Sequence, residues 1–135
     1  MKKITLLAFA AVVMTFMGCL PAMAQVHVTF TTSSSFYAEN AKMPPGTYTI
    51  RQMQDEPAIQ ILQNSSGSHT VMLDSQPSSK ASKGTPEILF NRYGTMDYLE
   101  AVETSNGTSI DFPTTSAEKV AAKKDTAKPH TVPAK

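Results

Sequence analysis

The chain has 135 residues, with 12 lysines and arginines against 11 acidic residues, one cysteine and no tryptophan. This length allows one domain after processing, and a single cysteine excludes an internal disulfide framework. Residues 25–112 carry five basic side chains against nine acidic ones, while residues 113–135 carry five lysines against two acids. The body therefore lacks the basic surface of a nucleic-acid-binding protein.

The first 24 residues read as a bacterial-type secretory signal. Lys2 and Lys3 supply the positive start, residues 4–17 form an apolar run, and a small-x-small site ends at Ala24, before Gln25. The run is shorter than the roughly 20 residues that a transmembrane helix needs. We therefore predict cleavage between Ala24 and Gln25, export to the periplasm or the outside of the cell, and no transmembrane segment in the mature form.

Cys19 leaves an alternative open. It follows Gly18, the small residue that a lipoprotein signal places before its cysteine, but Phe16 stands where such signals usually carry leucine. Lipidation of Cys19 would anchor the mature protein to a membrane. Cleavage after Ala24 would instead leave a mature chain without cysteine, and so without thiol catalysis or thiolate metal ligands.

Alternation of apolar and polar residues with a period of two dominates from Val26 to Phe112. Turn formers interrupt it at residues 44–46, 64–68, 94–95 and 106–107. This spacing predicts a mainly β domain, a small antiparallel sandwich or barrel of six to eight short strands. A strand set with a helix packed across one end is the alternative.

Two segments break this pattern. Ser75 to Pro86 holds two prolines and four serines, with no apolar residue larger than Ala81, and we predict that it is the most mobile loop. After residue 112, Thr115 and Glu118 have the spacing of a capping box, which predicts a short helix within 113–124. We expect 25–112 to be the β-rich domain and 125–135 to be a disordered, solvated tail rather than a polyanion-binding site.

The three histidines, His27, His69 and His130, are far apart in the sequence. None shares a ligand motif with another, and no carboxylate stands at a short fixed offset from them. We interpret all three as surface residues, and we expect no metal site and no cofactor.

Asp97, Glu100 and Glu103 form the main acidic cluster. On a regular strand, residues 97 and 103 would point to one side and residue 100 to the other, so the three could not converge on one ion or one glycosidic oxygen. We interpret them as solubilising residues that protect a β surface. No serine lies in a nucleophile motif with supporting context, so we predict no catalytic residue.

Aromatic residues could form a stacking surface for sugars or belong to the core. We favour the core, with tyrosine hydroxyls at its margin, because the chain lacks the tryptophan that sugar-binding faces commonly use. The residues concerned are Phe36, Tyr37, Tyr48, Phe90, Tyr93, Tyr98 and Phe112.

Two segments carry a family resemblance: Met43–Arg51, with the sequence MPPGTYTIR, and Ile88–Gly94, with the sequence ILFNRYG. They resemble matching segments of a family of small secreted β-rich proteins from environmental bacteria, over roughly residues 28–124. Asn91 stands where the family often has histidine, and Pro45 where it has alanine, so the position of Asn91 is a poor candidate for a shared active site. The resemblance implies export and a β-rich fold, but no activity.

We therefore expect a non-enzymatic envelope or extracellular protein with a binding or structural role, whose partner is an unknown macromolecule or none. The alternative is a carrier that holds a small apolar ligand in a barrel cavity. A hydrolase is the third reading. It would need Arg51, Arg92, a histidine and a carboxylate to meet in one cleft.

Overall fold

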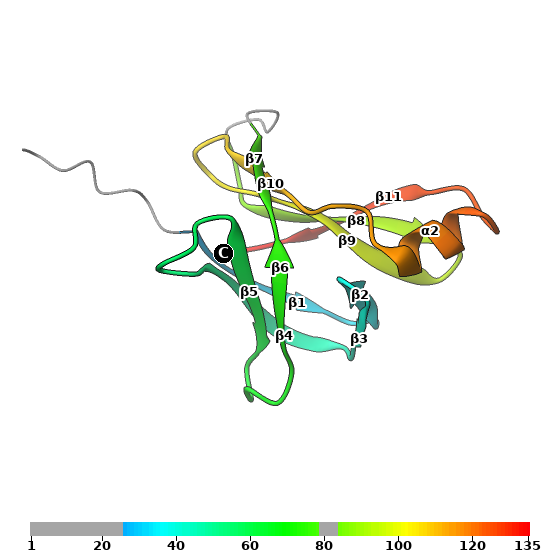
Figure 1. Ribbon diagram of the computed structural model, residues 1–135, viewed down its shortest axis with the longest axis horizontal. Coiled ribbons are helices and arrows are strands. Elements are labelled where there is room, and N and C mark those ends of the chain that lie inside the picture. The colour runs from blue at the N-terminus through cyan, green and yellow to red at the C-terminus, as the bar shows by residue number, and fades with distance from the viewer. Residues whose placement is uncertain (1–25, 79–83) are drawn as a thin grey trace, which may run out of the picture.

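The structure is a computed structural model that describes residues 26–78 and 84–135 (Figure 1). The residues named for signal cleavage and lipidation, Ala24, Gln25 and Cys19, lie outside this part of the chain. So do residues 79–83 of the expected loop. The described part is mainly β, with one short helix, and its strands form two sheets.

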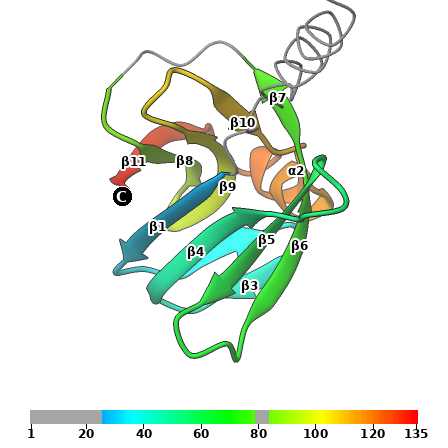
Figure 2. The ribbon, with the colours of Figure 1, turned by 90° about the vertical axis from the view of Figure 1, so that its left-hand side faces the viewer.

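The first sheet is antiparallel, and Figure 2 shows its strands side by side. Its order is β1 (His27–Thr32), β4 (Gly46–Gln52), β5 (Ile59–Asn64) and β6 (Thr70–Asp74). The register places Val28 opposite Ile50 and Ile50 opposite Leu62, and all three side chains are buried. The expected alternation is confirmed, because residues two apart on a strand point to the same face.

The second sheet faces the first. Its order is β11 (Lys128–Pro133), β8 (Glu87–Tyr93), β9 (Met96–Glu103), β10 (Ser109–Asp111) and β7 (Gln76–Ser78). Beside β9, the short strand β2 (Phe36–Ala38) runs parallel to it and pairs with β3 (Ala41–Met43). The sheets join where β6 continues into β7 and where Thr29 and Lys135 exchange two backbone hydrogen bonds of 2.9 Å. The result is a sandwich-like arrangement rather than a closed barrel.

The described residues contain eleven strands, more than the six to eight expected. Four of them, β2, β3, β7 and β10, have only three residues, which is too short for a periodic signal. One of these, β7, lies in the segment that was expected to be a loop, where Pro77 pairs with Ile110.

The expectation of a disordered tail over 125–135 is wrong. Residues 128–133 form β11, which pairs with β8 along its whole length, from Lys128 opposite Arg92 to Pro133 opposite Glu87. Val132 and Ala134 belong to the hydrophobic core. The composition suggested disorder, but alternate residues of this segment bury apolar side chains, and that burial is enough to order a strand.

Aromatic rings fill the space between the sheets. Phe36 lies 5.1 Å from Tyr48 and 5.4 Å from Phe90 between ring centroids, and Phe30 lies 5.8 Å from Tyr48. All four rings are at most 2 % exposed. The interpretation of Phe36, Tyr48 and Phe90 as core residues is therefore confirmed.

The glycine and tyrosine of the Pro-Pro-Gly-Thr-Tyr segment have structural roles. Gly46 starts β4 at φ 154°, a conformation that other residues rarely adopt. The Tyr48 hydroxyl donates a hydrogen bond to the carbonyl oxygen of Pro44 while its ring stays in the core. The turn and the strand that follows it are thus tied together by one side chain.

The helix α2 (Ser116–Ala122) begins as the capping-box spacing predicts. The Thr115 hydroxyl accepts a hydrogen bond from the backbone N–H of Glu118, and the Asn40 side chain accepts one from the N–H of Ala117. These two oxygens satisfy backbone donors that a helix start leaves free.

We expect Thr115→Ala to lower the free energy of unfolding by about 1 kcal/mol, because the Glu118 N–H loses its acceptor. Urea unfolding followed by tyrosine fluorescence measures this difference. Thr114→Ala is the matched control, since Thr114 is exposed and makes no side-chain hydrogen bond within the described chain. Equal stabilities for the two variants would contradict the capping role.

Candidate functional site

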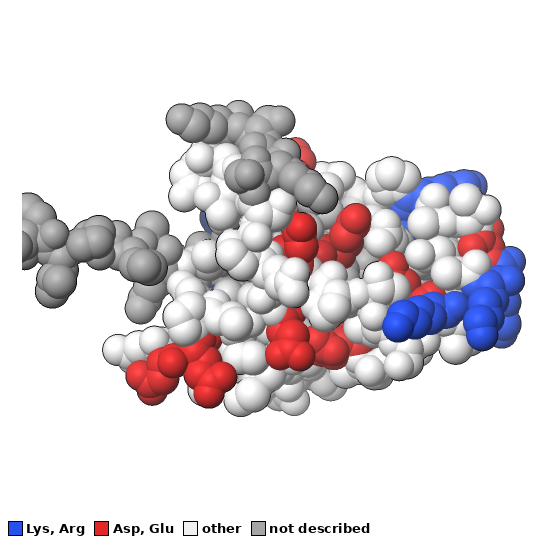
Figure 3. All heavy atoms as spheres, turned by 45° about the horizontal axis from the view of Figure 1, so that its top comes forward, with Lys and Arg blue, Asp and Glu red and all other residues white. Residues whose placement is uncertain are grey.

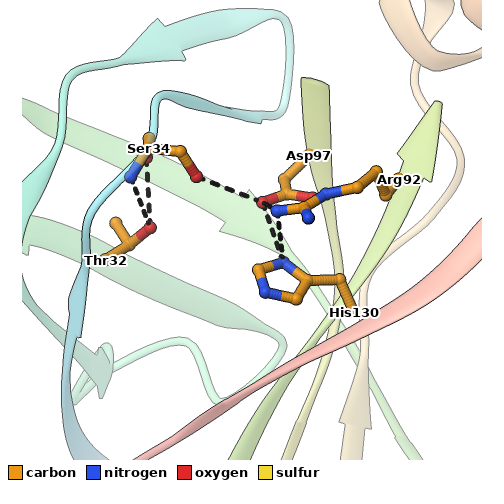
Figure 4. A network of polar contacts seen from close by, with 5 residues as sticks. All are labelled: Thr32, Ser34, Arg92, Asp97 and His130. Atoms are coloured by element: carbon orange, nitrogen blue, oxygen red, sulfur yellow. Dashed lines mark hydrogen bonds and ion pairs between the residues drawn. The ribbon is translucent and has the colours of Figure 1, made fainter. Parts of the chain in front are cut away.

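Three charged or ionisable side chains, one each from β8, β9 and β11, meet in the second sheet (Figure 4). The Arg92 guanidinium holds the Asp97 carboxylate with two hydrogen bonds, Nε to Oδ1 at 2.7 Å and Nη2 to Oδ2 at 2.8 Å. His130 Nδ1 lies 2.9 Å from Asp97 Oδ2 and 2.9 Å from Arg92 Nη2. We call Arg92, Asp97 and His130 the Asp97 cluster.

Strand register explains how these residues meet. The hairpin of β8 and β9 turns through Gly94, at φ 62°, and Thr95, which places Arg92 directly opposite Asp97. On the other side of β8, His130 of β11 lies opposite Phe90. Residues two apart on β8 share a face, so all three cluster residues lie on the inner side of the second sheet.

Asp97 is the buried centre of this arrangement. It is 1 % exposed, whereas Arg92 and His130 are 34 % and 31 % exposed. Burial acts to raise the pKa of Asp97, but the hydrogen bonds and charges of Arg92 and His130 outweigh it and hold the pKa below its usual value. The carboxylate therefore stays ionised in the interior because the Arg92 guanidinium pairs with it and the His130 imidazole contacts it.

A fourth side chain reaches the cluster from the loop after β1. The Ser34 hydroxyl lies 3.5 Å from Asp97 Oδ2, and the Ser34 backbone is itself bonded to the Thr32 hydroxyl. Ser34 contacts the carboxylate, not the histidine. Ser34 and the Asp97 cluster together thus join three segments that are far apart in the sequence.

This geometry differs from a hydrolytic triad, in which aspartate orients one histidine nitrogen and the other activates a nucleophile. His130 Nδ1 does meet Asp97, but within the described residues no hydroxyl bonds its Nε2, and Arg92 also occupies the carboxylate. Arg51 lies on β4 opposite His27 and outside the cluster. Of the set expected for a hydrolase, the structure brings together Arg92, a histidine and a carboxylate, without Arg51.

The interpretation of Asp97 as a solubilising surface residue is wrong, and so is the expected orientation of the acidic cluster. The ladder of β8 and β9 shifts register between Leu89 and Phe90, which leaves Glu100 without a direct partner. Such a bulge changes which side chains share a face. Asp97 therefore points inward, while Glu100 and Glu103 lie together on the outer side.

Glu100 and Glu103 line an open hollow of about 340 Å³ beside α2, together with Asp111 and Glu118. Glu118 is buried and accepts hydrogen bonds from Asn91 (2.9 Å) and Tyr93 (3.2 Å). Burial and then the charges of Glu118 and Asp111 raise the pKa of Glu100. Within the described chain, no three such side chains are arranged to hold a metal ion.

Tyrosines on this outer side form a second aromatic group. Tyr37 stacks on Tyr98 with ring centroids 5.1 Å apart, and Tyr93 meets Tyr98 edge-on at 5.5 Å. Tyr98 is 8 % exposed, and the Tyr93 hydroxyl is bonded to Glu118 of α2. These rings pack between the sheet and the helix, so they are not part of the central core.

His27 and His69 are exposed, as expected, but His130 belongs to the Asp97 cluster. Sequence reasoning missed it because it lies in the segment interpreted as a disordered tail. The available signal was the alternation of His130, Val132 and Ala134, which predicts one face of a strand. The hairpin turn at Gly94 likewise predicts the pairing of Arg92 with Asp97.

Fold and site together define a small β-sandwich with a buried, internally paired ionic cluster. Comparison with family models, curated proteins and solved structures found no match to the chain. Among the described residues, no helix is long and apolar enough to cross a membrane.

Proposed function

We propose that this chain is an exported, non-enzymatic protein with a binding or structural role, and that it belongs to the family of small secreted proteins that it resembles. The Asp97 cluster is the observation that supports the absence of catalysis. Both carboxylate oxygens of Asp97 are used inside the cluster: Arg92 makes two bonds to them, and His130 Nδ1 lies 2.9 Å from Oδ2. Such a cluster locks strands together and leaves its carboxylate no free role as a base.

The packing between the sheets favours this role over that of a carrier. An apolar ligand needs an enclosed cavity of a few hundred Å³. The centre of this domain is occupied by the rings of Phe30, Phe36, Tyr48 and Phe90. The hollows at the surface, such as the one of about 330 Å³ beside Val26 and Pro86, lie at the rim.

Export is tested by fractionating cells that express the full chain and measuring the intact mass of the product. We expect an exported form that begins at Gln25. An exported form lipidated at Cys19 would also support export, with membrane anchoring in addition. Recovery of the unprocessed chain in the cytosol would overturn the proposal.

The absence of catalysis is tested with chromogenic ester, amide, phosphoester and glycoside substrates. We expect the wild type, His130→Gln and His69→Gln to show the same background rates. His69 is the matched control because it is exposed and lies in the turn before β6 of the other sheet, outside the Asp97 cluster. A rate that His130→Gln abolishes and His69→Gln retains would establish an enzyme instead.

A further inference from the structure

Four lysines gather at one end of the molecule, around α2 and the start of β11. They are Lys119, Lys123, Lys124 and Lys128, and all are exposed. Figure 3 shows blue side chains concentrated at this end, while most acidic side chains lie along the rest of the visible face. The basic residues near the C-terminus and the acidic residues of the rest of the chain are thus also separated in the folded molecule.

Helical geometry places three of these lysines beside an exposed apolar residue. At 100° per residue, Lys119, Lys123, Val120 and Lys124 fall in that order on an arc of about 140°. Val120 is 54 % exposed, while Glu118 and Ala121, on the opposite side, face the sheet. Lys123 continues the helical backbone as the C-cap. We call Lys119, Val120, Lys123, Lys124 and Lys128 the basic end.

The charge of the basic end is not neutralised within the molecule. Throughout the described chain, the ion pairs are those of Asp97, and none of the four lysines takes part in one. Asp125 is the single acidic residue between Lys119 and Lys128, and one of its oxygens accepts a hydrogen bond from the Thr126 N–H. Four positive charges against one negative leave a surface that attracts anions.

We propose that the basic end binds the surface of an anionic lipid bilayer. Each lysine close to such a surface contributes favourable electrostatic energy, and an apolar side chain among the lysines can enter the headgroup region. Val120 favours a lipid surface over a soluble polyanion, because a soluble polyanion offers an apolar side chain no apolar environment. This inference replaces the interpretation of the lysine-bearing segment as a solvated tail.

The inference names a partner for the proposed binding role and rests on that role. Co-sedimentation with vesicles tests it, using the protein as recovered from the exporting cell. We expect binding to phosphatidylcholine vesicles with about 30 % phosphatidylglycerol, and little binding to phosphatidylcholine alone. Salt at roughly 0.5 M should abolish it by screening. Equal binding to both vesicles, or to neither, would overturn the inference and leave the tests of export and catalysis unaffected.

Charge placement is tested with matched double variants. Lys123→Gln with Lys124→Gln should weaken vesicle binding at least roughly tenfold. Lys42→Gln with Arg51→Gln removes the same charge from exposed positions on β3 and β4 and should change binding by less than about twofold. If the control pair weakens binding as much, net charge rather than the basic end is responsible and the inference fails.

The choice of a lipid surface is tested with Val120→Asn, measured against vesicles and against heparin as a soluble polyanion. We expect weaker vesicle binding and unchanged heparin binding. Lysine-dependent binding to heparin without binding to vesicles would assign the basic end to a soluble polyanion and overturn the lipid proposal. All substituted side chains are exposed, so unfolding curves should match that of the wild type.

Discussion

Asp97→Ala is expected to lower the free energy of unfolding by about 3 kcal/mol. The whole free energy of unfolding of a typical domain is roughly 5–15 kcal/mol, so this loss is a large part of it. The substitution removes the acceptor of two Arg92 bonds and one His130 bond. It leaves the side chains of Arg92 and His130 facing each other without the carboxylate that both contact. Arg92 and His130 are each about one-third exposed, so water can partly solvate them. We therefore expect a loss of stability near the lower end of the range for removing one partner of a buried ion pair.

Urea unfolding measures this loss, and Asp55→Ala provides its control. Asp55 is exposed and takes part in no side-chain hydrogen bond within the described chain. We expect its substitution to change the free energy of unfolding by less than about 0.5 kcal/mol. Comparable losses in both variants would show that Asp97 is not a structural centre.

The lowered pKa of Asp97 also predicts a pH dependence. A carboxylate whose pKa is lower in the folded state than its ordinary value of 3.8 contributes stability above that value. The contribution falls as the pH drops through the folded-state pKa, where the folded protein must take up the proton. The stability difference between the wild type and Asp97→Asn should therefore be constant near neutral pH and shrink under acid conditions. A difference that stays constant down to about pH 2 would contradict the ionised, paired state.

Local sequence patterns predicted most of the fold, because the strands follow the alternation of apolar and polar residues and the turns fall at turn-forming residues. The hairpin at Gly94, the alternation through Val28 and Ile50, and the cap at Thr115 each depend on residues close in the sequence. These are the cases in which backbone preferences and one buried face agree. The sequence therefore predicted the fold class and the start of the helix.

The Asp97 cluster could not be predicted in the same way, because it depends on two features that local patterns do not reveal. The bulge at Glu100 changes the faces of β9, so simple alternation assigned the acidic residues to the wrong sides. His130 reaches Asp97 only because β11 pairs with β8, a contact between distant segments. Composition alone described this segment as polar and proline-bearing, and gave no sign of the strand that it joins.

The Asp97 cluster lies next to the aromatic core. The register pairs Phe36 of β2 with Asp97 of β9, so the buried carboxylate and the central ring lie on neighbouring strands. The cluster closes the end of the sandwich where Arg92 and His130 meet water. Beside the cluster, Phe36 of β2 contacts rings from both sheets. The side chain of this short strand therefore packs across the interior and links the two sheets.

Phe36→Ala should therefore have the largest effect of any single substitution considered, a loss of about 4 kcal/mol. The side chain is 0 % exposed, and its ring lies 6.0 Å from Phe30 and 5.4 Å from Phe90 between centroids. Those two rings belong to different sheets, so the cavity left by alanine would open between them. Surrounding strands, paired on both sides, cannot close such a cavity fully.

Urea unfolding compares Phe36→Ala with Phe112→Ala and Phe36→Leu. Phe112 is only partly buried against the core, so its loss should cost clearly less than that of Phe36. Leucine fills much of the space and should restore stability to within about 1.5 kcal/mol of the wild type. If alanine at position 36 costs no more than alanine at position 112, the ring is not a bridge between the sheets. Without that bridge, β2 would be held to β9 mainly by backbone hydrogen bonds.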